Sequence, residues 1–137
     1  QMPFSIYDQR LLQNGTLEML KNFNISIHLR SIFLQGLILT PSANWPNFIS
    51  KDFRKHHDRL MQYLRKENIN ILDFIFWYFS ENINPDVIVV GISSESEFDI
   101  LLKSYEEVVL NKKLKNFNNK FHDLYWEIEK DLDPRKW

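Results

Sequence analysis

The segment His28-Leu29-Arg30-Ser31-Ile32-Phe33-Leu34-Gln35-Gly36-Leu37-Ile38-Leu39 predicts a short strand that runs into a tight turn containing Gly36. Residues 25–30 alternate strictly between apolar and polar side chains, as expected of a strand with one buried and one polar face. Polar residues follow where this strand ends, and α/β proteins bind their ligands at the carboxyl ends of strands. The segment is therefore the first candidate for a functional site.

A second strand is predicted at Val87-Ile88-Val89-Val90, a run of branched apolar residues that ends at Gly91. The run has no polar face, so we expect both of its sides to be covered, as in a parallel sheet. Ile92-Ser93-Ser94-Glu95-Ser96-Glu97 then supplies the serines and acidic residues of a helix start. That helix is expected to continue to about residue 111 and to bury Phe98, Leu101, Leu102 and Val109.

Strands and helices alternate along the rest of the chain. Residues 1–6 contain Pro3, which permits only a strand end or an edge strand. Apolar periodicity and capping residues predict helices over residues 16–23, from Asn47 or Ser50 to about residue 66, and over about residues 71–81. A short last helix is predicted from the apolar residues Phe121, Leu124, Tyr125 and Ile128. Connections of this length between strands indicate parallel βα units, and hence an α/β fold.

The composition is that of one ordinary globular domain, with 137 residues of which 44% are hydrophobic. A formal net charge of -1 gives no sign of nucleic-acid binding or of attraction to a membrane surface. Without cysteine, neither a disulfide framework nor a thiolate metal site is possible. The longest apolar run, Phe74 to Phe79, is far shorter than the roughly 20 residues that span a bilayer. We therefore expect a cytoplasmic protein and, because the chain begins at Gln1 rather than Met, a piece of a longer one.

Three segments resemble, in order, the sixth-, seventh- and eighth-strand segments of the aldo/keto reductase family: Gln1-x-Pro3-Phe4-Ser5 with Asp8-Gln9-Arg10, then Arg30 to Leu39, then Val87 to Ser94. Asp133-Pro134-Arg135-Lys136-Trp137 is similar to the ending of one bacterial branch. The resemblance implies an incomplete (β/α)8 TIM-type barrel, in which residues 1–110 hold the C-terminal three strands with their helices. Residues 111–137 would then form a C-terminal extension.

The resemblance also implies an NAD(P)-dependent oxidoreductase that reduces a carbonyl by hydride transfer. The family's catalytic Tyr, Lys, His and Asp lie on earlier strands, so no catalytic residue is assigned and the chain alone is expected to be inactive. An arginine can stack on the nicotinamide ring as the family's aromatic residue does. The positions that match cofactor contacts are Gln1 and Arg30 at the nicotinamide, Ser31, Gln35 and Gly36 around the pyrophosphate, and Gly91, Ser93 and Ser94 at the adenosine phosphate.

The choice between NAD and NADP depends on the helix start after Gly91. A glycine turn before a helix N-terminus presents free N–H groups to an anion. Many family members hold the 2′-phosphate of NADP there with Arg or Lys, whereas this chain has Glu95 and Glu97. Two carboxylates would repel that phosphate, so NAD is the expected cofactor, with a small carbonyl compound as the substrate.

The same residues also have purely structural interpretations, which the sequence leaves open. Ser93 and Ser94 have the character of helix caps. Arg30, at a strand end, has that of a surface ion-pair partner, and Gln35-Gly36 that of a simple turn.

The adjacent histidines His56 and His57 suggest a metal site, but helix geometry argues against one. Adjacent helix positions point about 100° apart, so the two rings cannot share an ion as histidines at i and i+4 can. We interpret both histidines as solvated helix surface and expect no metal site.

A different class of function fits the same resemblance, namely a non-catalytic aldo/keto reductase-like binding or regulatory module that a partner stabilises. Coding sequence upstream of Gln1 would discriminate the two: the family's Asp, Tyr, Lys and His there favour the enzyme, and a start codon just before it favours the module. On either hypothesis, an isolated unit of three strands leaves strand edges unpaired and apolar faces bare. We therefore expect the chain to self-associate.

Overall fold

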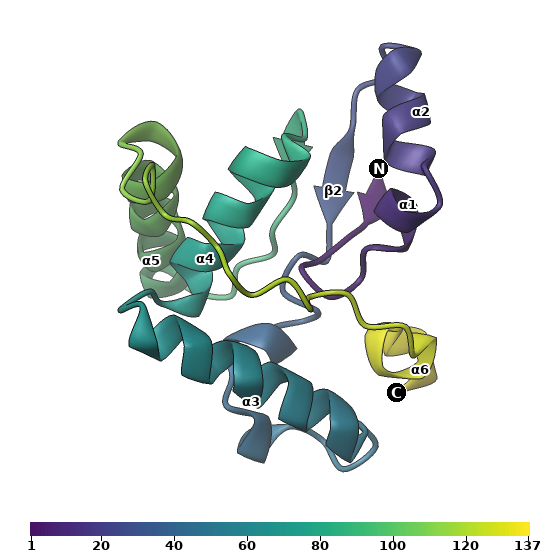
Figure 1. Cartoon of the computed structure of the whole chain (residues 1–137), viewed down its shortest axis with the longest axis vertical. Coiled ribbons are helices and arrows are strands. Elements are labelled where there is room, and N and C mark those ends of the chain that lie inside the picture. The colour runs from purple at the N-terminus through teal and green to yellow at the C-terminus, as the bar shows by residue number, and fades with distance from the viewer.

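A three-stranded parallel sheet forms the centre of the computed structural model, which describes all residues 1–137 (Figure 1). Its strands are β1 (Met2–Pro3), β2 (His28–Arg30) and β3 (Val87–Ile88), in the spatial order β1-β2-β3. Leu29 in the central strand is paired with Met2 on one side and Ile88 on the other. The α/β class predicted from the sequence is confirmed.

The incomplete (β/α)8 TIM-type barrel is wrong. A barrel of that type closes eight parallel strands on themselves, whereas this sheet is open and its strands are only two or three residues long. β1 and β3 are both edge strands, with β2 as their one neighbour. Pro3 lies in an edge strand, as its missing N–H requires.

Helices fill the connections between the strands. They are α1 (Arg10–Gln13) and α2 (Thr16–Asn22) between β1 and β2, α3 (Lys51–Lys66) and α4 (Ile71–Tyr78) between β2 and β3, and α5 (Glu95–Tyr105) and α6 (Glu129–Leu132) after β3. Wider π-type turns extend α4 over Phe79–Ile83 and α5 over Glu106–Leu110, and 3-10 turns lie at Leu37–Leu39, Ser42–Asn44 and Pro134–Lys136. None of these helices combines the length and apolar character that crossing a bilayer requires.

Side-chain caps begin the three longest helices. Ser50, Asn70 and Ser94 each accept a hydrogen bond from the backbone N–H three residues further on, at 3.1, 2.7 and 3.2 Å. Such a cap satisfies one of the N–H groups that the first helical turn leaves unpaired and contributes about 1 kcal/mol. The helix starts predicted at Ser50, Asn70 and Ser94 are confirmed.

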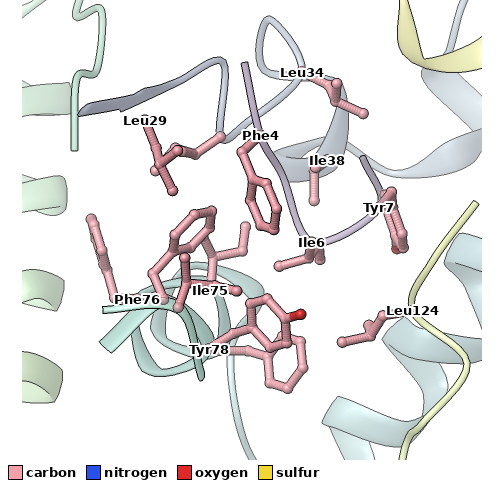
Figure 2. Close-up of a cluster of buried hydrophobic side chains, with 14 of the residues drawn as sticks. Phe4, Ile6, Tyr7, Leu29, Leu34, Ile38, Ile75, Phe76, Tyr78 and Leu124 are labelled. Atoms are coloured by element: carbon pink, nitrogen blue, oxygen red, sulfur yellow. The ribbon is translucent and has the colours of Figure 1, made fainter. Parts of the chain in front are cut away.

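The hydrophobic core surrounds α4, whose residues Phe74 to Tyr78 are all buried together with Phe79 (Figure 2). The segment after β1 brings Phe4 onto this helix, where its ring meets that of Phe79 edge-on with the centroids 5.8 Å apart. Leu29 adds the central strand, and Leu124 adds the C-terminal segment. A helix that is apolar all round is expected to be buried on more than one side, as α4 is here.

Two further departures from the sequence predictions lie at β3 and at α5. Val87 and Val89 remain 40% and 37% exposed, because β3 has a neighbour on one side alone. The expectation that both sides of this strand are covered is therefore wrong. Phe98 and Leu102 of α5 are also exposed, while Leu101 and Ser104 are its buried residues.

The C-terminal segment does not form the helix expected around Leu124. It instead runs in an extended path across the molecule, and the backbone N–H of Trp126 donates to the carbonyl of Tyr7 at 3.0 Å. The side chain of Leu124 is buried without a helix to carry it. Helical periodicity was a false signal here, because tertiary contacts determine the path of this segment.

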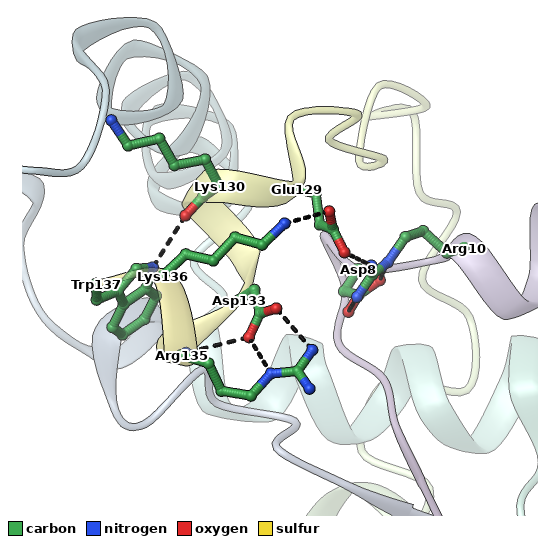
Figure 3. Close-up of polar contacts among 8 residues, drawn as sticks. All are labelled: Asp8, Arg10, Glu129, Lys130, Asp133, Arg135, Lys136 and Trp137. Carbon is green, nitrogen blue, oxygen red and sulfur yellow. Dashed lines mark hydrogen bonds and ion pairs between the residues drawn. The ribbon is translucent and has the colours of Figure 1, made fainter.

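Ion pairs attach the end of the chain to its beginning (Figure 3). Arg10 donates to both Asp8 and Glu129, each at 2.8 Å. Glu129 also accepts from Lys136 at 2.5 Å. Asp133 accepts two hydrogen bonds from the guanidinium of Arg135, which lower the pKa of that carboxyl to about 2.

Truncating Phe79 tests the core around α4. Phe79 is 0% exposed, so Phe79→Ala is expected to lower the free energy of unfolding by about 3–5 kcal/mol through lost burial and a cavity. Phe23→Ala is the matched control, because Phe23 is 72% exposed and its loss should change stability by less than about 0.5 kcal/mol. Urea unfolding followed by circular dichroism measures both, and equal effects would contradict the core assignment.

Candidate functional site

A pocket of about 510 Å³ lies at the carboxyl ends of β2 and β3, between the turns that follow these two strands. The turns lie together because parallel neighbouring strands end at the same edge of a sheet. Six of the eight sequence-predicted cofactor residues line this pocket: Arg30, Ser31, Gln35, Gly36, Gly91 and Ser93. Two segments far apart in the sequence thus form one site.

The other two predicted residues lie outside the lining. Gln1 precedes β1, and the pairing of Met2 with Leu29 puts it level with the amino end of β2, away from the pocket. Ser94 is adjacent to the pocket as the N-cap of α5, so its structural interpretation as a helix cap is confirmed. The structure does not bring Gln1 together with the other seven.

The turn after β2 has a strained backbone. Ser31, Leu34 and Gln35 have positive φ angles of 62°, 46° and 54°, and Gly36 follows with 84°. Residues other than glycine pay about 1–2 kcal/mol for this left-handed conformation. Buried Ile32 and Leu34 anchor the turn in the core and hold it there. Strain of this kind clusters at ligand-binding sites, where the backbone must present its groups in one arrangement.

Arg30 extends from the end of β2 into the pocket lining and is exposed. Its Nη1 donates to Ser31 Oγ at 3.2 Å, and it forms no salt bridge with any carboxylate. The interpretation of Arg30 as a surface ion-pair partner is therefore wrong. The rest of its guanidinium is free to contact an anion or an aromatic ring.

The turn after β3 presents a second set of donors. Both the backbone N–H and the hydroxyl of Ser93 donate to Glu97 Oε2, each at 2.7 Å. These two hydrogen bonds stabilise the charged carboxylate and lower the pKa of Glu97. The N–H of Glu97 in turn donates to Ser94 Oγ at 3.2 Å.

The residues that line this pocket are suited to binding a ligand. Arg30 and Glu97 are the only ionisable side chains of the pocket lining, which contains no histidine, tyrosine, lysine or aspartate. The guanidinium, two hydroxyls and an amide side chain can hold an anionic or polar ligand. None of them is a general acid suited to proton transfer near neutral pH.

Comparison with protein-family models, curated proteins and solved structures finds no match to this chain. The function of the pocket must therefore be inferred from its geometry and from the residues that line it.

His56 and His57 are buried in the core, so their interpretation as solvated helix surface is wrong. Tyr7 Oη lies 2.8 Å from His57 Nδ1, and His56 Nε2 lies 3.2 Å from the carbonyl oxygen of Leu124. The signal was present in the sequence, because both histidines continue the i, i+3, i+4 stripe that begins at Phe53. No group of three or more His, Cys, Asp or Glu side chains is arranged to hold a metal ion.

Burial makes His57 a pH-dependent element of stability. Its Nε2 has no hydrogen-bond partner, and desolvation lowers its pKa from 6.5 to about 4. Because His57 binds a proton more tightly in the unfolded chain than in the folded one, protonation favours unfolding. The contribution of His57 to the free energy of unfolding is therefore fully present above pH 6.5 and is lost as the pH falls toward 4. We expect a loss of about 3 kcal/mol over this range from His57.

Unfolding in urea at a series of pH values measures this loss. His57→Gln cannot titrate, so its free energy of unfolding should depend less on pH than that of the native chain between pH 6.5 and 4. A native chain equally stable at both ends of that range would contradict the burial of an uncharged His57.

Two substitutions of Gln35 test whether its backbone conformation is strained. Gln35→Gly and Gln35→Ala both remove the exposed side chain, but only glycine is at ease at a φ of 54°. We expect Gln35→Gly to be more stable than Gln35→Ala by about 1 kcal/mol in urea unfolding. Equal stability of the two variants would show that this backbone conformation is not populated.

Proposed function

We propose that the chain binds a nicotinamide dinucleotide in the pocket between the two turns. It would do so as the cofactor-contacting part of an NAD(P)-dependent, aldo/keto reductase-like oxidoreductase that reduces a carbonyl by hydride transfer. The observation that carries the proposal is the convergence of six residues, each matched to a cofactor contact by sequence, in one pocket. They come from two separate segments, and the pairing of β2 with β3 brings them together.

The size and chemistry of the pocket support a dinucleotide. Its volume of about 510 Å³ falls within the range of small-molecule sites, which is roughly 300–1,000 Å³. In this proposal the guanidinium of Arg30 stacks on the nicotinamide ring. Ser31, Gln35 and Gly36 face the pyrophosphate, and Gly91 and Ser93 face the adenosine phosphate at the N-terminus of α5.

In this role the chain binds and orients the cofactor but transfers no proton. Carbonyl reduction needs an acid to protonate the developing alkoxide, and the pocket lining offers no residue suited to that task near neutral pH. The same observation favours, as a second candidate, a dinucleotide-binding regulatory module that carries out no reduction. In both cases the 137-residue chain alone is expected to bind the cofactor without oxidising NADH in the presence of a carbonyl compound.

Titration with NADH tests the proposal, with nicotinamide fluorescence as the readout. Arg30→Ala is expected to weaken binding at least tenfold, equivalent to about 1.4 kcal/mol, because it removes the stacked guanidinium. Arg65→Ala is the matched control, since Arg65 is an exposed arginine on α3 that makes one contact within its own helix.

Two results would contradict the proposal. One is the absence of NADH binding at millimolar concentration, and the other is equal weakening by Arg30→Ala and Arg65→Ala.

A further inference from the structure

The outer edge of β3 presents backbone groups that no other part of the chain uses. The N–H of Val89 points toward β2, where it donates to the carbonyl of Leu29 at 2.8 Å. Successive residues of a strand direct their backbone groups to opposite sides, so the N–H groups of Ile88 and Val90 point away from β2. The N–H of Val90 forms no hydrogen bond. A row of such groups is a template on which another strand can pair.

The two edges of the sheet differ in how they are protected. Native edge strands are commonly blocked by proline or by charged side chains. Edge strand β1 contains Pro3, which lacks an N–H group. Residues 87–90 at the other edge contain neither proline nor a charged residue. The edge of β3 is therefore the one open to pairing.

An apolar groove of about 490 Å³ lies between this edge and α5. Val87 and Val90 line it from the strand, and Phe98, Leu102 and Tyr105 line it from the helix. All five side chains are exposed. Alternate side chains of an added strand point to the same face, so its apolar residues would enter this groove while its backbone pairs with β3.

The charges beside the groove are mostly negative. Residues 95–110 contain five acidic residues and a single basic one, Lys103. Glu95, Asp99 and Glu106 are exposed and form no salt bridge. Their spacings of four and seven residues place them on one side of the helix, next to the side that lines the groove. Charge complementarity therefore favours a partner with basic side chains.

We propose that β3 accepts a strand from a partner protein, whose alternate apolar side chains fill the groove and whose lysine or arginine side chains face the acidic side of α5. Addition of a strand to an exposed sheet edge is an established mode of peptide recognition. A second copy of this chain fits the groove less well. It offers either β3, with the same acidic residues beside it, or β1, which contains Pro3. The inference is independent of the proposed function, because it concerns a different pocket.

Titration of the full chain with short peptides tests the inference. The probe is an end-capped peptide of alternating lysine and valine, and its binding is followed by the shifts of the Ile88 and Val90 amide signals in nuclear magnetic resonance. We expect it to bind at least tenfold more tightly than the matched peptide of alternating glutamate and valine. The lysine-valine peptide with alternate backbone nitrogens methylated keeps its charges and side chains but cannot pair with a strand. It should bind at least tenfold more weakly than the unmethylated peptide.

Variants of the chain locate the binding. Leu102→Lys puts a positive charge into the groove, and Glu106→Lys reverses one charge beside it. Each is expected to weaken binding of the lysine-valine peptide at least fivefold. Glu18→Lys makes the same charge change on α2, where Glu18 is also exposed, and should alter binding less than twofold.

Four results would overturn the inference. They are no binding of the lysine-valine peptide at millimolar concentration, equal binding of the basic and acidic peptides, equal binding after backbone methylation, and equal effects of Glu106→Lys and Glu18→Lys. Sedimentation velocity adds a fifth, because a native dimer that Leu102→Lys dissociates would show that a second copy occupies the groove.

Discussion

The pairing of β2 with β3 is the interaction on which the rest of the structure depends. The N–H of Val89 donates to the carbonyl of Leu29 at 2.8 Å, and the carboxylate of Asp86 accepts from the N–H of Ile27 at 2.7 Å. This short ladder places the turns after β2 and β3 side by side. Without it, Arg30 and Ser93 would have no common pocket. Two-residue strands have little stability of their own, so the core around α4 must hold the ladder in register.

Local chemistry explains what the sequence predicted well. The helices that begin at Ser50 and Asn70 were predicted because a cap is a contact between near neighbours in the chain. Tertiary contacts explain the failures. The resemblance implied part of a closed barrel, but whether a sheet curls into a barrel or stays open depends on contacts that no single segment encodes. The burial of His57 depends on Tyr7, which lies 50 residues earlier in the sequence.

In the candidate site, too, some features could be predicted from the sequence and others depend on tertiary contacts. Arg30 and Ser93 could be predicted as neighbours, because parallel strands present their carboxyl ends at one edge. The hydrogen bonds of Glu97 could not be predicted in full, because the sequence shows only that a negative charge lies at this helix start. They depend on the direction in which the Glu97 side chain folds back toward Ser93. Gln1 lies away from the pocket because the register of β1 sets its level in the sheet.

Chemical-shift mapping of the labelled chain during addition of NADH tests the central claim most directly. The amide signals of residues 30–36 and 89–97 should shift together, because these two turns form one pocket. A second pocket of about 490 Å³, lined by apolar residues including Phe98 and Tyr105, lies beside β3 and provides an internal comparison. Shifts confined to that apolar pocket, or no shifts at all, would contradict the assignment of the cofactor to the two turns.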